Sequence, residues 1–333
     1  MERNVFIDRL KGYACFLVLF GHVIRGIRTA GINIPKIFWG VELFIWSFHV
    51  ALFLFLSGVV YRLTKEWKGH KTKWNFILHK LLGLGIPYVV FSIVYISINS
   101  LIGGTNTQFS MTDILFIWKT PVAQYWFLYA LFFLFCIWTI LSGILKNWQI
   151  MVLTLLIGYG FPLLGVSLGS FEIVFYSSLA FGIGTFINFE NLTKPKPLIK
   201  CLIVLMHLIV GTVFILLNLI EYPLIKELML LFGIYASILF ISLLQDCKII
   251  ARFLSFINQY SFQIYLVHTI FTAGVRILLL RLHITQWWIH VPVGTVCGIA
   301  FSVLAAIIAK KIGFLNFFFF PTKAFKKGSV VQK

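Results

Sequence analysis

The sequence predicts an all-α membrane protein, a polytopic helix bundle with about ten transmembrane helices and both termini in the cytoplasm. Hydrophobic residues make up 60% of the 333 residues, against roughly 45–50% in soluble domains. Charged residues make up 11%, against about 25% in soluble domains. A soluble fold cannot cover that much apolar surface, whereas a bilayer can, because lipid tails are as apolar as leucine.

The apolar residues are grouped into runs of about the length that crosses a bilayer, near 20 residues each. The predicted spans cover residues 11–30, 38–61, 76–101, 124–143, 149–166, 171–189, 198–219, 224–245, 257–280 and 287–310. Prolines such as Pro35, Pro121 and Pro223 lie in or beside the connections, where they interrupt helices. We expect one membrane domain over residues 1–320 and a basic cytoplasmic tail over 321–333.

The net charge of +18 follows from the positions of the basic residues. Most of the 28 Lys and Arg residues lie at the N-terminus, at the C-terminus and in connections on one side of the membrane, above all 62–80. That bias is the positive-inside pattern of a multi-pass protein. It predicts a bacterial inner (plasma) membrane location, with membrane lipid as a partner and no nucleic acid.

The five cysteines form no Cys-x-x-Cys pair, and most of them lie in apolar runs. Structural metal sites and disulfide frameworks use paired spacings. The sequence therefore predicts no metal site and no disulfide framework.

Ionisable side chains inside spanning helices cost about 2.5–3.5 kcal/mol each on insertion scales and mark candidate functional sites. The predicted spans contain Lys11, His22, Glu42, His49, Glu172, His207 and His268. At a rise of about 1.5 Å per residue, His22 lies roughly 16 Å from Lys11, in the same outer-to-middle layer as Glu42 and His49. A histidine beside a carboxylate suits proton abstraction, because the carboxylate orients the ring and raises its basicity. The alternative is that each histidine only forms hydrogen bonds between helices.

The connection after the second span is the most basic stretch of the chain. Its cations are Arg62, Lys65, Lys68, Lys71, Lys73 and Lys80. Such clusters bind phosphates, and coenzyme A carries a 3′-phosphate and a pyrophosphate. The alternative is that the cluster sets the topology and contacts anionic lipid headgroups.

The first two predicted spans contain two distinctive segments. The first span has Lys11, ten intervening residues and then His22, and the second reads Phe48-His49-Val50-Ala51-Leu52-Phe53-Leu54-Phe55-Leu56-Ser57-Gly58. Both segments resemble the acyltransferase-3 family of membrane proteins, which has a basic residue, ten residues and a histidine in its first helix. Its fucose 4-O-acetylase-like branch has a Phe-His-x-x-Leu-Phe-x-Phe-x-Ser-Gly segment in its second.

Three later segments extend the resemblance in the same order along the chain. They are Lys80 ahead of Ile86-Pro87-Tyr88, then Trp126-Phe127-Leu128, then Ser261-Phe262-Gln263-Ile264-Tyr265-Leu266-Val267-His268. Family members often carry two arginines three residues apart before Ile-Pro-Tyr. This chain has Lys80 and Gly83 there, a departure from a two-arginine phosphate clamp.

The resemblance implies an acyltransferase that moves an acyl group, commonly acetyl, from cytoplasmic acyl-CoA to a carbohydrate hydroxyl. Acyl-CoA would be a co-substrate, the acceptor a cell-surface carbohydrate or its precursor, and polysaccharide-assembly proteins possible partners. In this interpretation His22 is the catalytic base and Glu42 steadies its ring. The residues expected to bind the coenzyme A phosphates are Lys11, Arg62, Lys73 and Lys80. Those expected to contact the acceptor or support the site are His49, Ser57, Trp126 and His268.

Two other functions fit the same features. A proton-coupled transporter would also have about ten spans with buried His and Glu, although no internal repeat is evident in the sequence. A non-catalytic component of a polysaccharide-export assembly would have no need of His22.

Overall fold

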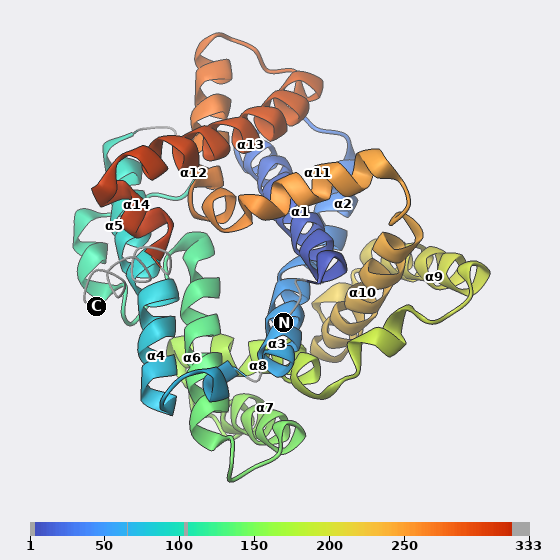
Figure 1. Ribbon diagram of the computed structural model, residues 1–333. Helices are drawn as coiled ribbons and strands as arrows, with labels where there is room; N and C mark the ends of the chain where they lie inside the picture. Colours follow the sequence, from blue (N-terminus) through green and yellow to red (C-terminus); the bar gives the residue numbers. More distant parts are fainter. Residues whose placement is uncertain (1–3, 65, 103–105, 322–333) are drawn as a thin grey trace. The chain divides into compact units, whose positions relative to one another are not determined.

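The computed structural model describes residues 4–64, 66–102 and 106–321 of the chain (Figure 1). Within these ranges the chain forms α-helices joined by short turns and 3-10 segments, and its β pairing is one isolated bridge between Ser142 and Leu145. The all-α class is thus confirmed. Residues 322–333, nearly all of the predicted tail, lie outside the described residues.

Eight segments of the described chain are long and apolar enough to cross a membrane. Their helices are α1 (Val5–Thr29), α2 and α3 (Lys36–Trp46 and His49–Leu63), α4 and α5 (Lys73–Lys80 and Ile86–Leu101), α6 (Trp126–Leu141), α9 (Pro197–Leu216), α10 (Pro223–Leu243), α12 (Ser261–Arg281) and α13 (Trp287–Lys311). The remaining helices are α7 (Asn147–Leu163), α8 (Glu172–Phe186), α11 (Lys248–Gln259) and α14 (Gly313–Phe319). A polytopic helix bundle is therefore confirmed.

Two of the predicted spans are shorter than expected. The fifth and sixth are α7, with 17 residues, and α8, with 15. At about 1.5 Å per residue such helices reach roughly 25 Å and 22 Å, against a hydrocarbon core of about 30 Å. The predicted helices are present at both places, but neither has the length of the other eight spans.

The second predicted span is interrupted near its middle, just before His49. α2 ends at Trp46, and the turn tightens there, with Phe48 N donating to Ile45 O at 3.3 Å. The Ser47 hydroxyl donates back to Phe44 O at 2.7 Å. Such local hydrogen bonds compete with the regular helical ladder. His49 therefore starts α3 at a break in the middle of a membrane span.

The ninth predicted span, residues 257–280, also differs, because the helix breaks at Tyr260. The segment before the break forms the separate helix α11, which buries every third residue, at Ala251, Leu254 and Ile257. This spacing places one face of α11 against α1 (Figure 1). α12 then begins at Ser261 and carries His268.

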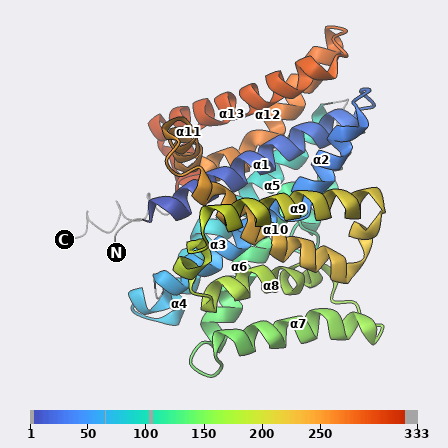
Figure 2. The same cartoon turned by 90° about the vertical axis from the view of Figure 1, so that its right-hand side faces the viewer.

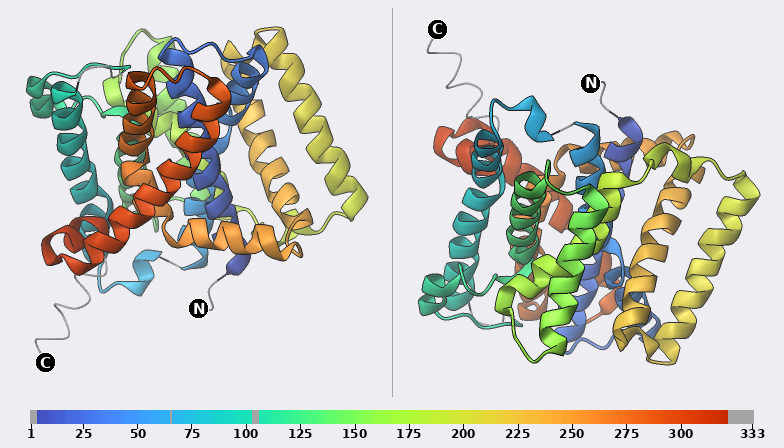
Figure 3. Two further views of the ribbon diagram at one scale, coloured as in Figure 1. Left: turned by 90° about the horizontal axis from the view of Figure 1, so that it is seen from above. Right: turned by 90° about the horizontal axis from the view of Figure 1, so that it is seen from below.

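The chain divides into two compact units. The first comprises Met1–Ser57 with Ile187–Phe301, and the second comprises Gly58–Phe186 with Ser302–Lys333. In the first unit α1 packs against α2, α10, α11 and α12, while α9 lies antiparallel beside α10 (Figure 3). Close approach of α1 to α11 depends on Gly12, since a Cβ there would lie 2.0 Å from Leu254 O.

The second unit is built around α6 and α8. Helix α6 packs against α4 and α8, and α7 lies alongside α8 (Figure 2). Its core is aromatic, with the Phe181 ring on α8 in contact with Trp138 at 5.0 Å, Phe135 at 5.3 Å and Tyr61 at 6.0 Å between centroids. A π-helical turn at Leu81–Gly85 joins α4 to α5, directly before Pro87, which has no N–H for the helical ladder.

Candidate active site

The first unit gathers three polar aromatic side chains around His22 of α1. The His22 ring lies 5.1 Å from the ring of His268 on α12 and 5.3 Å from that of Trp46 at the end of α2, measured between centroids. Trp46 in turn lies 5.2 Å from His49. The sequence placed His22 and His49 in one layer by depth alone, and tertiary packing adds His268 and Trp46 to that layer.

Backbone hydrogen bonds fix the orientation of two of these rings. Nδ1 of His49 lies 2.7 Å from Ile45 O, and Nδ1 of His268 lies 2.9 Å from Ile264 O. A carbonyl oxygen only accepts, so in both rings the Nδ1–H donates and neutral Nε2 carries a lone pair. Both Nε2 atoms are buried and have no hydrogen-bond partner in the described part of the chain. Each ring therefore offers an acceptor inside the site.

His22 differs from these two histidines because its ring is not anchored. It is only partly buried, and it forms no hydrogen bond with any residue in the described ranges. A ring in this state keeps both nitrogens for a substrate, or for a neighbouring acceptor such as Nε2 of His268. An available ring nitrogen is what a general base needs to accept a proton.

Glu42 contacts two arginines rather than His22, contrary to the expectation that it steadies the ring. Its Oε1 accepts from Arg25 Nε at 2.8 Å, and its Oε2 accepts from Arg28 Nε at 2.7 Å. Both arginines lie on α1, one and nearly two turns beyond His22. The Arg25 guanidinium also stacks on the Trp46 ring at 3.4 Å, a cation–π contact. Glu42 thus holds Arg25 against Trp46 and shapes the site indirectly.

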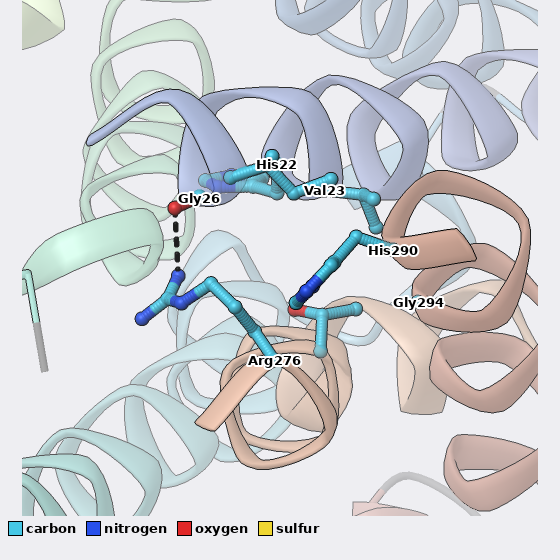
Figure 4. Close-up of a pocket in the computed structure, with 8 residues that line it drawn as sticks. His22, Val23, Gly26, Arg276, His290 and Gly294 are labelled. Atoms are coloured by element: carbon cyan, nitrogen blue, oxygen red, sulfur yellow. Dashed lines mark hydrogen bonds between the residues drawn. The ribbon is translucent and has the colours of Figure 1, made fainter. Parts of the chain in front are cut away.

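A cavity opens beside His22 within the first unit (Figure 4). Three helices line it: α1 with His22, Val23, Gly26 and Ile27, α12 with Thr272 and Arg276, and α13 with His290 and Gly294. The space inside it is about that of one water molecule, far too small for a nucleotide or a sugar chain.

Arg276 and His290 are cavity residues that the sequence interpretation missed. Arg276 lies inside α12 with only 7% of its surface exposed. His290 is 1% exposed, and its Nε2–H donates to Ile284 O at 2.8 Å. The signal was present, since both are ionisable residues next to or inside predicted apolar spans. Among the described residues, no group of three His, Cys, Asp or Glu could hold a metal ion.

Lys11 lies on the same face of α1 as His22. Eleven residues correspond to three helical turns, so the two side chains project from one stripe about 16 Å apart. A molecule lying along this stripe would have its anionic end at Lys11 and its other end at His22.

The basic residues of the second unit have partners that bear on their predicted role. Arg62 Nη1 donates to Phe186 O at 2.6 Å, and Lys73 Nζ donates to Ile140 O at 3.1 Å. Both bonds satisfy carbonyls at helix ends, of α8 and α6, which is a structural task. Arg62 and Lys73 are therefore weaker candidates for phosphate binding than the sequence suggested.

Lys80 has a different environment. Its ammonium lies 3.9 Å from the centroid of the Phe135 ring. It also influences His70, because partial burial and then the Lys80 charge lower the pKa of the His70 imidazole. The His70 and His79 rings lie 5.3 Å apart. An anion bound beside Lys80 would oppose this effect, as expected for a phosphate-binding cluster.

Two further predicted residues have local contacts. The Ser57 hydroxyl donates to Phe53 O of its own helix at 2.8 Å. Trp126 begins α6 in the second unit and contacts the neighbouring Phe127 ring at 6.4 Å. Neither residue lines the cavity beside His22.

Comparison with known proteins assigns a family to this fold and site. The model of the acyltransferase-3 family, an acyltransferase domain, matches residues 4–307. Comparisons with curated proteins and with solved structures found no match. Because the family match covers nearly the whole chain and includes every residue of the His22 site, the chain belongs to the acyltransferase-3 family and is a multi-pass membrane acyltransferase.

Proposed function

We propose that this acyltransferase transfers an acyl group, most simply acetyl, from cytoplasmic acyl-CoA to a hydroxyl of a cell-surface carbohydrate or its precursor. The observation that carries the proposal is the His22 ring, which borders a cavity, is unanchored, and has histidine acceptors around it. The sequence resemblance to the fucose 4-O-acetylase-like branch supports a carbohydrate acceptor. A bacterial plasma membrane and a polysaccharide-assembly context follow from the same proposal.

In the proposed reaction His22 is the general base. It removes the proton of the acceptor hydroxyl as the oxygen attacks the thioester carbonyl carbon. The C–S bond then breaks, and the imidazolium returns the proton to the coenzyme A thiolate. A positioned base of this kind is worth about 10²–10⁴-fold in rate.

His268 replaces Glu42 as the residue that positions the His22 ring in this scheme. Its Nδ1–H is held by Ile264 O, so its Nε2 accepts. A centroid separation of 5.1 Å brings facing ring nitrogens to hydrogen-bonding distance once the rings align. The anchored ring of His268 then fixes which nitrogen of His22 faces the substrate.

The coenzyme A moiety is proposed to lie with its phosphates at the cytoplasmic side, to which the charge pattern of the sequence assigns Lys11 and Lys80. Its pantetheine arm would follow the α1 stripe from Lys11 toward His22, a path of about 16 Å along the helix. The cations of the 62–80 connection would attract the phosphates electrostatically. No metal ion takes part in this scheme.

The test uses the full-length protein purified into lipid vesicles, with radiolabelled acetyl-CoA and a set of methyl glycosides as acceptors. We expect labelled, alkali-labile ester with the wild type and at least a roughly 100-fold loss with His22→Ala. His207→Phe is the matched control. His207 is a buried histidine of the same unit that packs among Phe44, Phe48 and Phe232, and its loss should leave the rate within about threefold of wild type.

Full activity in His22→Ala would end the proposed role of His22. Proton flux driven by sugar, without any ester product, would instead support the transporter alternative.

A further inference from the structure

The cavity beside His22 contains a buried positive charge that the proposed base mechanism does not use. Arg276 enters the cavity from α12, and its Nη1 donates to Gly26 O on α1 at 3.1 Å (Figure 4). A guanidinium in a membrane span is costly to bury, and such residues mark functional sites. Here the charge is held next to the residue proposed to start the reaction.

The local backbone makes room for this guanidinium. A Cβ at Gly26 would lie 2.7 Å from Arg276 Nη1, so any larger residue at this position would displace the guanidinium. The donor bond to Gly26 O fixes the guanidinium one helical turn from His22. The planar fork of arginine can make this bond and still direct other N–H groups elsewhere.

The other two cations near His22, Arg25 and Arg28, do not line the cavity. Each of them forms an ion pair with one carboxylate oxygen of Glu42. Acyl transfer places negative charge on the former carbonyl oxygen of the thioester. A fixed donor in a site of low dielectric stabilises that charge strongly.

We propose that Arg276 is a second catalytic residue, and that its guanidinium binds the thioester carbonyl oxygen and then the oxyanion of the tetrahedral intermediate. The inference rests on the proposed function and deepens it. When the acceptor oxygen bonds to the carbonyl carbon, its proton passes to His22 and the carbonyl π electrons move to the oxygen beside Arg276. Those electrons re-form the C=O bond as the C–S bond breaks, and His22 returns the proton to the thiolate.

The first experiment separates binding from catalysis in the full-length protein in vesicles, with acetyl-CoA as donor. Arg276→Gln should lower kcat by about 10²–10³-fold, the usual cost of losing an oxyanion donor. The KM for acetyl-CoA should stay within about threefold of the wild-type value, because the hydrogen bond from Arg276 stabilises the transition state more than the bound substrate. Arg276→Lys keeps the charge without the planar fork and should recover part of the rate. Arg281→Gln, an exposed site on the same helix, is the control and should match wild type.

A second variant addresses the case in which Arg276→Gln does not fold. Gly26→Ala keeps the Arg276 side chain but displaces its guanidinium, because the new methyl group would lie 2.7 Å from Nη1, so it should also lower kcat without changing the KM for acetyl-CoA. Gly274→Ala is its control, since a Cβ at Gly274 meets nothing within 4 Å. Equal kcat values for Gly26→Ala, Gly274→Ala and wild type would contradict the proposal.

A binding measurement tests the carbonyl contact directly, without turnover. Two coenzyme A analogues are compared: a ketone in which CH₂ replaces the thioester sulfur, and an S-ethyl thioether that has no carbonyl. Wild type should bind the ketone about tenfold or more tightly, as a hydrogen bond from a charged donor allows. In Gly26→Ala the ratio should fall toward one. An unchanged ratio would overturn the role of Arg276.

The outcomes also distinguish this inference from the proposed function. If wild type neither binds the analogues nor transfers acetyl from acetyl-CoA, the proposed function fails, and the Arg276 proposal fails with it. If wild type is active and depends on His22, while Arg276→Gln retains full kcat, only the Arg276 proposal is wrong.

Discussion

At the scale of single residues, the site depends on which ring nitrogens are already occupied. The backbone holds His49 and His268 through Nδ1, so their Nε2 atoms face the interior as acceptors. His22 forms no such bond in the described structure and borders the cavity. Trp46 adds a buried indole N–H without an acceptor among the described residues. An unanchored ring among anchored ones is the feature that supports the proposed role of His22 as the general base.

One prediction belongs to His268. His268→Phe removes the Nε2 acceptor and should lower kcat by about tenfold or more, the cost of one hydrogen bond to a charged group. The KM for acyl-CoA should be unaffected, since His268 contacts the base and not the donor. His268→Gln restores an acceptor and should recover part of the rate. Steady-state kinetics of the two variants test this, and equal losses in both would show that His268 only fills space.

At the scale of helices, close packing around α1 gives the site its precision. Gly12 lets α11 approach α1, Gly21 leaves room for the Trp46 indole, and Gly26 leaves room for Arg276. All three glycines lie on α1, the helix that carries His22. The break between α2 and α3 then turns Trp46 and His49 toward this helix. Each element therefore contributes one polar group to a site that α1 organises.

The helix contact at Gly12 supports a prediction about stability. In Gly12→Ala the new Cβ would lie 2.0 Å from Leu254 O, and backbone atoms cannot move aside without separating α1 from α11. Overpacking of this kind costs about 1–3 kcal/mol, so the midpoint of thermal unfolding in detergent should fall. Gly40→Ala is the control, because its Cβ meets nothing within 4 Å. Its midpoint should be unchanged or slightly higher, as expected from helix propensity.

At the scale of the whole molecule, the distribution of charge predicts the orientation in the membrane. Most Lys and Arg residues lie in connections on the side assigned to the cytoplasm, in line with the positive-inside rule. That orientation brings Lys11 and the 62–80 connection to the cytoplasmic side, where the proposed donor acyl-CoA would bind. His22 lies about 16 Å further along α1 than Lys11, so in the proposed function the acyl group would pass along the helix to meet its acceptor.

Cysteine labelling in intact cells checks this orientation. The native cysteines are replaced first, and one cysteine is then introduced by Lys68→Cys or by Lys36→Cys, both at exposed positions. A membrane-impermeant maleimide added outside should label the Lys36→Cys protein only. After the cells are lysed, it should label both. External labelling of the Lys68→Cys protein would reverse the assigned orientation.

The sequence by itself determined the membrane bundle, most of its spans and the family, and it predicted His22 as the catalytic candidate. These depend on composition, on the lengths of apolar runs and on spacings along one helix, all of which are local properties of the chain. The partners of His22 are different, because they depend on the direction of each side chain around its helix and on which helices become neighbours. The depth of each residue along its helix suggested Glu42 as the partner of His22. In the folded protein Glu42 instead forms ion pairs with Arg25 and Arg28. Only the tertiary structure brought His268 and Arg276, more than 240 residues further along the chain, to the ring of His22.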